Sequence, residues 1–294
     1  ETRADKDRRD GGGSRSMADD EDGGEGDDGE EEVRLLPSRS WDWSRLAALL
    51  PLPQSGERTE PLPASWDTIR DCPACPEMIV LPAGDTVIGA PAGDREATAA
   101  EQPARHVRVW PGFAIARFEI SVVELGRAGM APSPSSGTCA GRTDESMVGP
   151  ATCLTWQEAS RYAAWLSAVS GHRYRLPSAA EWEYAARAAS APRQVASADT
   201  AALPVGPLPE AMGGGVAEFV ADCWADTLEN GSETVSAFQP NRVCWNRMLK
   251  DGADGEGRRW RRPSARRPIE PGTRSPDIGF RVVRELAGER EARR

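Results

Sequence analysis

Long apolar runs are missing from this chain of 294 residues. No run approaches the roughly 20 apolar residues that a membrane-spanning helix needs. The longest apolar stretch near the start, Leu46 to Leu52, is broken by Pro51 and follows a polar segment. No basic segment directly precedes it and no small-residue cleavage site clearly follows it, so it is a poor candidate for a signal peptide. We therefore expect no membrane span.

Histidine is also scarce, since the chain has only His106 and His172. They lie far apart in the sequence, which excludes a metal site built from several histidines. Cys72 and Cys75 have the spacing of a redox pair or of half a zinc site. A zinc site needs four ligands, however, and the chain has no second cysteine pair of this spacing. We expect this pair to form either a small local disulfide or two free thiols.

The six cysteines are even in number and allow three disulfides, although the count alone does not fix the pairing. Cys223 and Cys244 flank a long irregular segment, and Cys139 and Cys153 flank another, so we expect these two pairs. A protein of this size does not need disulfides for stability. Their number favours an oxidising compartment, such as the periplasm or the extracellular space.

The negative charge is concentrated at the start of the chain. The net charge is -10, and residues 1–32 contain 14 acidic and 5 basic residues, a net of -9. Such a segment cannot bury enough apolar surface to fold, so we expect a disordered acidic tail. It is either a solubilising extension or a docking tail for a basic partner. We divide the rest into a Pro-rich linker (33–71), one domain (72–286) and a charged C-terminal tail (287–294).

Helices and strands are expected at several places in the domain. The pattern predicts strands at 77–84 and 278–283, and a hairpin over 107–120 that turns at Pro111–Gly112. Two helices, 155–167 and 178–189, each begin with a capping box, formed by Thr155 with Glu158 and by Ser178 with Glu181. Residues 222–263 show little periodicity, which predicts a long irregular region.

Six segments occur in the order in which they occur in one enzyme family. They are Met78–Gly84, Phe118–Ser121, Pro150–Ala159, Tyr174–Arg187, Gly214–Phe219 and Gly279–Arg281. Together they span roughly 210 residues and resemble the formylglycine-generating-enzyme (sulfatase-modifying factor) family. The resemblance implies an α+β, C-type-lectin-like fold with two helices, a small twisted antiparallel sheet and much irregular chain. Trp156, Trp165, Trp182 and Tyr184 are then expected in the core, and Arg175, Arg187 and Arg281 as partly buried guanidinium groups, with Glu181 and Glu183 as natural partners.

The same resemblance implies a copper-dependent oxidoreductase that converts a sulfatase cysteine to formylglycine through two cysteines. These cysteines follow a Gly-rich segment that aligns here with Lys250–Asp254, of which only Gly252 keeps its type. The two cysteine positions fall near Glu256 and Arg261. A carboxylate and a guanidinium cannot replace two thiolates as ligands of copper(I). We therefore expect neither bound copper nor formylglycine generation, and we assign no catalytic residue.

Calcium is a further implication of the family. In this chain Glu218 is retained, but Gly215 stands where the family has an asparagine and Ala217 where it has a tryptophan. A calcium site would therefore use Glu218 with the carbonyl groups of Gly215 and Val216, although calcium takes six to eight oxygen ligands.

Two functions from different classes fit these observations. The first is a non-catalytic, lectin-like recognition or accessory module, in which the irregular region 222–267 forms the variable surface and the partner is another protein. The alternative is a family oxidoreductase that modifies a protein cysteine at a displaced site. The arginine-rich run Arg258–Arg262 is expected to support the fold or to neutralise the acidic tail, because the near-zero net charge of the domain argues against nucleic-acid binding. We expect a monomer.

Overall fold

The computed structural model describes residues 66–133, 139, 148–190, 208–229, 234–235, 244–253 and 256–286. Every described residue belongs to one compact unit, which lies within Pro53–Arg294. The predicted acidic tail, nearly all of the Pro-rich linker and the C-terminal tail lie outside the described residues. In the part of the chain that the structure describes, no helix is long and apolar enough to cross a membrane.

Three α-helices begin at capping boxes. Their bounds are Val122–Arg127 for α2, Trp156–Ser170 for α3 and Ala179–Ser190 for α4. The predicted boxes are confirmed, because Glu158 N donates to the Thr155 hydroxyl and Glu181 N donates to that of Ser178. A third box, at Ser121, opens the short helix α2, which the sequence pattern did not reveal. In α3 the buried positions recur at helical spacing and face the core, as expected.

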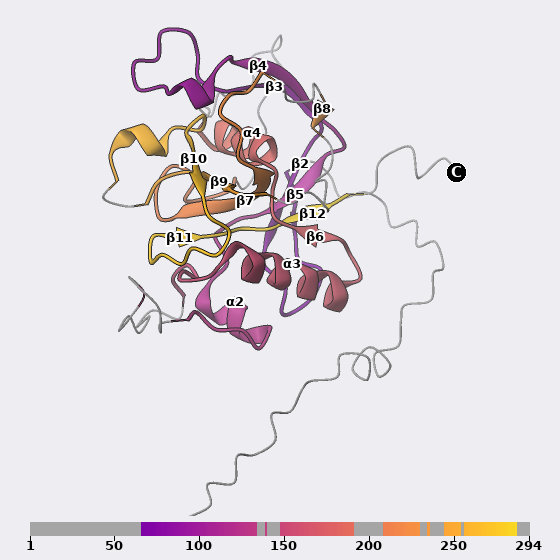
Figure 1. The fold of residues 1–294 in the computed structure, drawn as a ribbon. Helices are drawn as coiled ribbons and strands as arrows, with labels where there is room; N and C mark the ends of the chain where they lie inside the picture. Colours follow the sequence, from indigo (N-terminus) through magenta and orange to yellow (C-terminus); the bar gives the residue numbers. More distant parts are fainter. Residues whose placement is uncertain are drawn as a thin grey trace, which may run out of the picture. The chain divides into compact units, whose positions relative to one another are not determined.

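A five-stranded antiparallel sheet has the strand order β1-β2-β5-β12-β6 (Figure 1). The bounds in that order are Thr68–Ile69, Met78–Leu81, Phe113–Ala116, Val283–Glu285 and Tyr174–Arg175. Alternate residues of the central strands enter two apolar clusters: Val80 and Ala114 pack in one, Leu81 and Phe113 in the other. Both faces of these strands are covered, which is why they are apolar without interruption.

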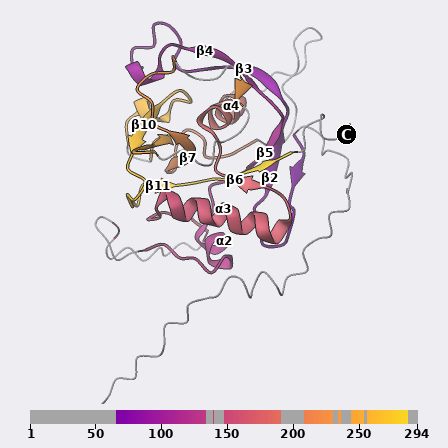
Figure 2. The same cartoon turned by 45° about the vertical axis from the view of Figure 1, so that its right-hand side comes forward.

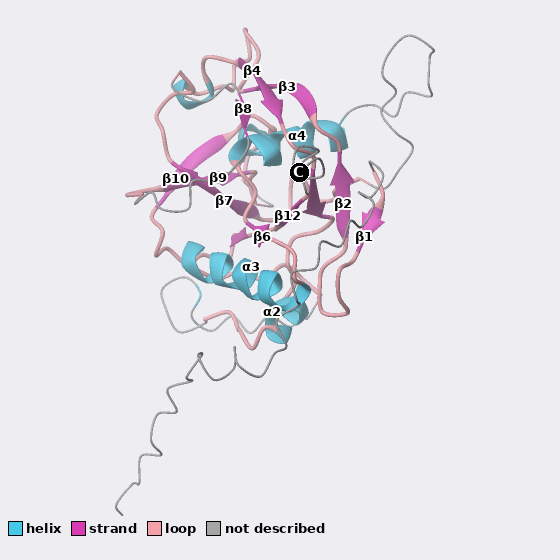
Figure 3. Ribbon diagram, turned by 90° about the vertical axis from the view of Figure 1, so that its right-hand side faces the viewer, coloured by secondary structure: helices cyan, strands magenta, loops and turns pink. Residues whose placement is uncertain are grey.

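A four-stranded sheet lies between the two longer helices, as Figures 1 and 3 show. Its order is β10-β9-β7-β11, with bounds Arg266–Ile269, Arg247–Lys250, Ala217–Cys223 and Ile278–Gly279. Phe219 and Leu249 are paired across β7 and β9 and pack in the cluster that includes the buried face of α3. Val220 and Met248 pack on the opposite face against Trp182 of α4. Figure 2 shows α2 beside α3 on the same side of the molecule.

The third sheet corrects the predicted hairpin over 107–120. It contains β3 (Gly84–Ile88), β4 (Arg105–Val109) and β8 (Thr234–Val235). β4 pairs with β3 whereas β5 pairs with β2, so β4 and β5 are successive parts of one arm of a long ribbon. Both arms of the ribbon bend where Gly112 lies against Leu81. A Cβ on Gly112 would lie 2.7 Å from the carbonyl oxygen of Leu81, so only glycine fits at this point of the bend. The bend carries the ribbon from one sheet into the next.

Two further expectations are corrected by the sheets. The predicted terminal strand at 278–283 is interrupted, because β11 pairs with β7 in one sheet and β12 pairs with β5 and β6 in another. The predicted irregular region contains β9, which holds β7 and β10 together. β9 has only four residues, too few for a periodic signal in the sequence.

The two expected disulfides are confirmed, and of the two alternatives for Cys72 and Cys75 the structure has the local disulfide. The three bonds join Cys72 to Cys75, Cys139 to Cys153 and Cys223 to Cys244. The last bond ties the end of β7 to the residues before β9 and so closes the loop between these neighbouring strands.

Candidate functional site

A fully buried ion pair joins β7 to the segment between β11 and β12. Arg281 donates to Glu218 through Nη2 at 2.6 Å and through Nε at 2.7 Å, and neither side chain is exposed. Trp182 Nε1 on α4 donates to the same carboxylate at 2.9 Å. The other donors of Arg281 reach the backbone carbonyls of Ala116, Arg117 and Glu210. The planar fork of arginine suits this role, because it satisfies a carboxylate and several carbonyls at once.

Asp251 lies beside this pair, directly after β9, in a backbone conformation that non-glycine residues seldom adopt, with φ of 65°. Its Oδ2 accepts from the N–H groups of Gly213 at 2.7 Å and Gly214 at 3.2 Å. Its Oδ1 accepts from Gly252 N at 2.7 Å. Gly213 and Gly214 have φ values of 118° and 158°, which only glycine adopts without strain. The glycine loop therefore turns its N–H groups towards a buried carboxylate that is 2% exposed.

Glu119 completes the cluster of buried acids. Its side chain is 5% exposed. Its Oε2 lies 3.9 Å from Nη2 of Arg281, a distance that allows an ion pair but not a hydrogen bond. Among the described residues, its Oε1 has no hydrogen-bond partner. A Cβ placed on Gly215 would lie 2.8 Å from this oxygen, so the glycine is required for the carboxylate to fit. One arginine thus faces three acidic residues.

Burial controls the protonation of two of these acids. It raises the pKa of Glu119 to about 7, and the negative charge of Glu218 raises it further against the opposing effect of Arg281. Burial also raises the pKa of Asp251 to about 7, again with a contribution from Glu218 and against the N–H groups of the glycine loop. Both carboxyl groups therefore titrate near neutral pH, which is common at functional sites and also occurs in structural networks.

Lys250, the residue before Asp251, belongs to a second buried network. It is 1% exposed, and its Nζ donates to Glu183 Oε2 at 3.1 Å. Glu183 Oε1 accepts from Arg187 at 2.6 Å and from Gly89 N at 2.9 Å. Burial lowers the pKa of Lys250, and the carboxylate of Glu183 opposes this effect. Arg187 and Glu183 are partners, as the sequence suggested.

The segment that aligns with the thiol loop of the family contains a carboxylate bound to an arginine. Glu256 Oε1 accepts from Arg267 Nη1 at 2.6 Å, and its Oε2 accepts from Ala253 N at 3.0 Å. Arg261 lies in the short 3-10 helix η3 (Arg258–Arg261) that follows. Both acceptor oxygens of Glu256 are therefore engaged in holding the loop.

These residues do not fit a copper(I) ion. Copper(I) favours thiolate and thioether ligands, whereas the two aligned positions carry a carboxylate and a guanidinium. All six cysteines are bonded to one another in disulfides, so none supplies a thiolate. We derive no chemical step through copper.

The described donors do not fit calcium either. Both oxygens of Glu218 face the Arg281 guanidinium, whose positive charge would repel a cation. The structure places Gly215 and Val216 in the loop before β7, beside this pair. Among the described residues, no group of three or more histidine, cysteine or acidic side chains is arranged to hold a metal ion. The calcium site remains a prediction that this geometry does not support.

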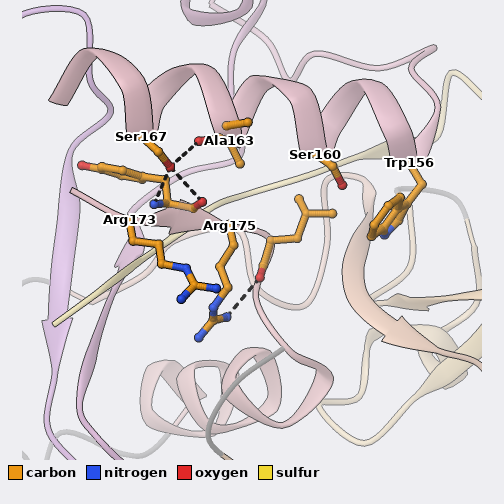
Figure 4. A pocket seen from close by; sticks show the side chains of 9 residues that line it. Trp156, Ser160, Ala163, Ser167, Arg173 and Arg175 are labelled. Carbon is orange, nitrogen blue, oxygen red and sulfur yellow. Dashed lines mark hydrogen bonds between the residues drawn. The ribbon is translucent and has the colours of Figure 1, made fainter. Parts of the chain in front are cut away.

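A separate cavity of about 300 Å³ lies between α3 and β6. Figure 4 shows Trp156, Ser160 and Ser167 on the helix above Arg173 and Arg175. Arg175 is bound to Glu181 at 2.7 Å, and the Ser167 hydroxyl donates to the Ala163 carbonyl at 2.9 Å. The cavity therefore presents mainly a hydrophobic wall with a charged rim and no group arranged for chemistry.

Arg262 of the arginine-rich run and the nearby Arg266 support the fold, which is one of the two roles expected for this run. Arg262 donates to Asp94 at 2.8 Å and to both oxygens of Glu101 at 2.7 and 2.8 Å. Arg266 donates to the carbonyl of Ala225 and stacks on Trp224, with 4.8 Å to the ring centroid. Arg258 and Arg259 remain exposed.

The lone histidines take no part in the acidic cluster. His106 is exposed on β4, and His172 lies beside Asp71 and Arg284 after α3. The sequence reading missed Glu119 and Asp251 as members of a site. Asp251 carried a usable signal, because it is an acidic residue within a Gly-rich segment, and Glu119 lay within a segment already matched to the family.

Comparison with known proteins agrees with this scaffold. The model of the sulfatase-modifying factor enzyme 1-like domain matches residues 67–203 and 210–286. The structure of PvdO from Pseudomonas aeruginosa is similar at 29% identity and a TM-score of 0.64, over 76% of this chain and 100% of that chain. Variable protein 1 of Treponema denticola shares the fold at 16% identity and a TM-score of 0.53, over 75% of this chain and 99% of that chain. No curated protein sequence matches the chain.

The family match covers most of the domain and includes every element that frames the buried Glu218–Arg281 pair. The mixed α+β architecture with antiparallel sheets is the one that the resemblance implied. The chain therefore belongs to the sulfatase-modifying-factor (formylglycine-generating-enzyme) family.

Proposed function

We propose that this chain is a family member that does not generate formylglycine and acts as a recognition or accessory module for another protein. The observation that carries the proposal is the state of the thiol loop. Glu256, near which the first thiol position falls, is bound to Arg267 at 2.6 Å, while every cysteine is in a disulfide. The family's cysteine oxidation needs two thiolates that bind a soft metal ion, and this loop supplies no thiolate.

The loops around β9 and β10 supply the surface that we assign to recognition. Trp245, just before β9, is 92% exposed, and Arg258 and Arg259 are exposed before β10. Trp260 lies between Arg259 and Arg267, with 5.1 and 5.4 Å from the guanidinium carbons to its ring centroid. Tryptophan and arginine are the side chains that contribute most often to protein–protein affinity. The exposed arginines favour a partner with an acidic surface.

A catalytic role is the second candidate, and the buried carboxylates favour it. Glu119 and Asp251 both titrate near pH 7, so each can hold or release a proton under neutral conditions. Asp251 lies directly after β9, next to the aligned loop, and Glu119 lies in the segment between β5 and α2. Carboxylates move protons and not electrons, so an oxidation at this place would need an external oxidant.

Turnover of a sulfatase-motif peptide separates the two candidates. The full chain is incubated with copper, oxygen, a thiol reductant and the peptide, and conversion of cysteine to formylglycine is followed by mass spectrometry. We expect no conversion, because the positions aligned with the family's two thiols carry no cysteine to bind copper. A copper-loaded formylglycine-generating enzyme that converts the same peptide in parallel shows that the assay works. Copper-dependent conversion by this chain would overturn the proposal and support the enzyme.

A further inference from the structure

The Cys72–Cys75 disulfide closes a tight turn at the start of the domain. Cys75 N donates to the carbonyl of Cys72 at 3.0 Å, and the two sulfurs bridge a sequence separation of only 3. Cys75 is completely buried, whereas Cys72 is partly exposed at the edge of the core. The two cysteines of the same bond therefore differ in their exposure to solvent.

The other two disulfides are placed differently. Cys139 and Cys153 are 0% and 5% exposed, so both are buried whereas Cys72 is partly exposed. Cys223 and Cys244 are partly exposed, like Cys72, but they close a separation of 21, against 14 for the Cys139 pair and 3 for Cys72–Cys75. A disulfide that closes a short loop restricts the unfolded chain least, so opening Cys72–Cys75 costs the fold least among the three.

The turn is also anchored without the disulfide. Arg70 Nη1 donates to the carbonyl of Cys75 at 2.8 Å. Asp71 accepts from the Tyr174 hydroxyl at 2.6 Å and pairs with Arg284 at 2.7 Å. These contacts hold the residues on both sides of Cys72 against the sheet, and they place a guanidinium group beside the turn that contains both sulfurs.

From this asymmetry we infer that Cys72–Cys75 is a reducible disulfide that exchanges with an external thiol by attack at Cys72 Sγ. The external thiolate forms a bond to Cys72 Sγ, the Cys72–Cys75 bond breaks, and Cys75 takes the electron pair as the leaving thiolate. A second external thiolate then attacks the mixed disulfide and releases Cys72. Two external thiols are thereby oxidised to one disulfide, and the protein disulfide is reduced to two thiols. This role is independent of the proposed recognition function.

The first test measures which disulfide opens first. The full-length native protein is equilibrated with glutathione buffers of increasing reducing power, alkylated, and mapped by mass spectrometry. The reducing power of each buffer is expressed as the squared concentration of reduced glutathione divided by the concentration of oxidised glutathione. We expect Cys72 and Cys75 to become alkylated at a value of this ratio that is about tenfold or more lower than the value needed for Cys139 and Cys153. Circular dichroism recorded on each sample should show an unchanged fold. Equal opening, or opening only with loss of the fold, would overturn the inference.

The second test locates the attacked sulfur with a matched pair of variants. Cys75→Ser leaves Cys72 free, and Cys72→Ser leaves the buried Cys75 free. Incubated with oxidised glutathione, Cys75→Ser should form the glutathione adduct about tenfold faster or more than Cys72→Ser, because the partly exposed thiol is accessible. Equal rates would contradict the assignment of Cys72. Should either variant fail to fold, the glutathione series on the native protein still decides whether the disulfide is reducible.

Discussion

Replacing Arg281 by methionine should lower the free energy of unfolding by about 4 kcal/mol, because it leaves the carboxylate of Glu218 buried without its ion-pair partner. Glu218 is 0% exposed. In the variant its carboxylate would keep the hydrogen bond from the Trp182 N–H but would lose those from the guanidinium group. Three backbone carbonyls would also lose a donor. Urea denaturation at neutral pH, with the disulfides intact, measures the loss.

The matched control is Arg108→Met, which breaks an ion pair with Asp85 at the surface. These side chains are 63% and 69% exposed, so we expect no measurable change in stability. If Arg281→Met is too unstable to purify, Arg281→Lys keeps the charge but loses the fork and should lie between it and the native protein. A loss no larger than that of the surface control would show that the buried pair does not hold the sheets together.

Replacing Glu119 by glutamine should make the protein more stable than the native chain at pH 8 by about 3 kcal/mol. Folding raises the pKa of Glu119 from 4.5 to about 7 through burial and through the charge of Glu218. Between pH 4.5 and about pH 7 the folded state therefore binds more protons than the unfolded state. The free energy of unfolding of the native protein falls as the pH rises through this range. Near pH 4 the carboxyl group is protonated in the folded state and largely so in the unfolded chain, so the native protein and the variant should be almost equal.

Denaturation midpoints of both proteins between pH 4 and pH 8 measure this effect. Glu270→Gln, at an exposed position in the loop after β10, should leave the pH dependence of stability unchanged. Equal stabilities of the Glu119→Gln variant and the native protein at pH 8 would mean that Glu119 is not a charged, buried group there.

The helices were the most predictable part of the fold. The starts of α3 and α4 are predicted by capping boxes at Thr155 and Ser178, because a capping box depends only on two residues three positions apart. The strands were predicted where they are apolar throughout, as in β2, but their partners were not. Pairing of β4 with β3 and of β5 with β2 depends on contacts distant in the sequence, and the Pro111–Gly112 pair looks the same in a hairpin turn and in a bend of a longer ribbon.

The site was predictable where one residue type decides the chemistry. Near the two aligned thiol positions the sequence has Glu256 and Arg261 and no cysteine, which predicts that a thiolate copper site is missing. The sequence could not show that Glu119, Glu218 and Asp251 share one buried region, because they come from three separate segments of the chain. It also could not show that Arg281 occupies both oxygens of the predicted calcium ligand Glu218, since this depends on where β7 lies relative to the segment after β11.

A family scaffold that is retained without its thiol chemistry requires every cysteine of the native protein to be bonded to another. Peptide mapping of the native protein, alkylated and digested without reduction, tests this directly. We expect three linked peptide pairs, Cys72 with Cys75, Cys139 with Cys153 and Cys223 with Cys244, and no alkylated cysteine. Alkylation of both Cys223 and Cys244 in the freshly purified protein would supply a free thiol pair at a displaced site and would contradict the proposed loss of thiol chemistry.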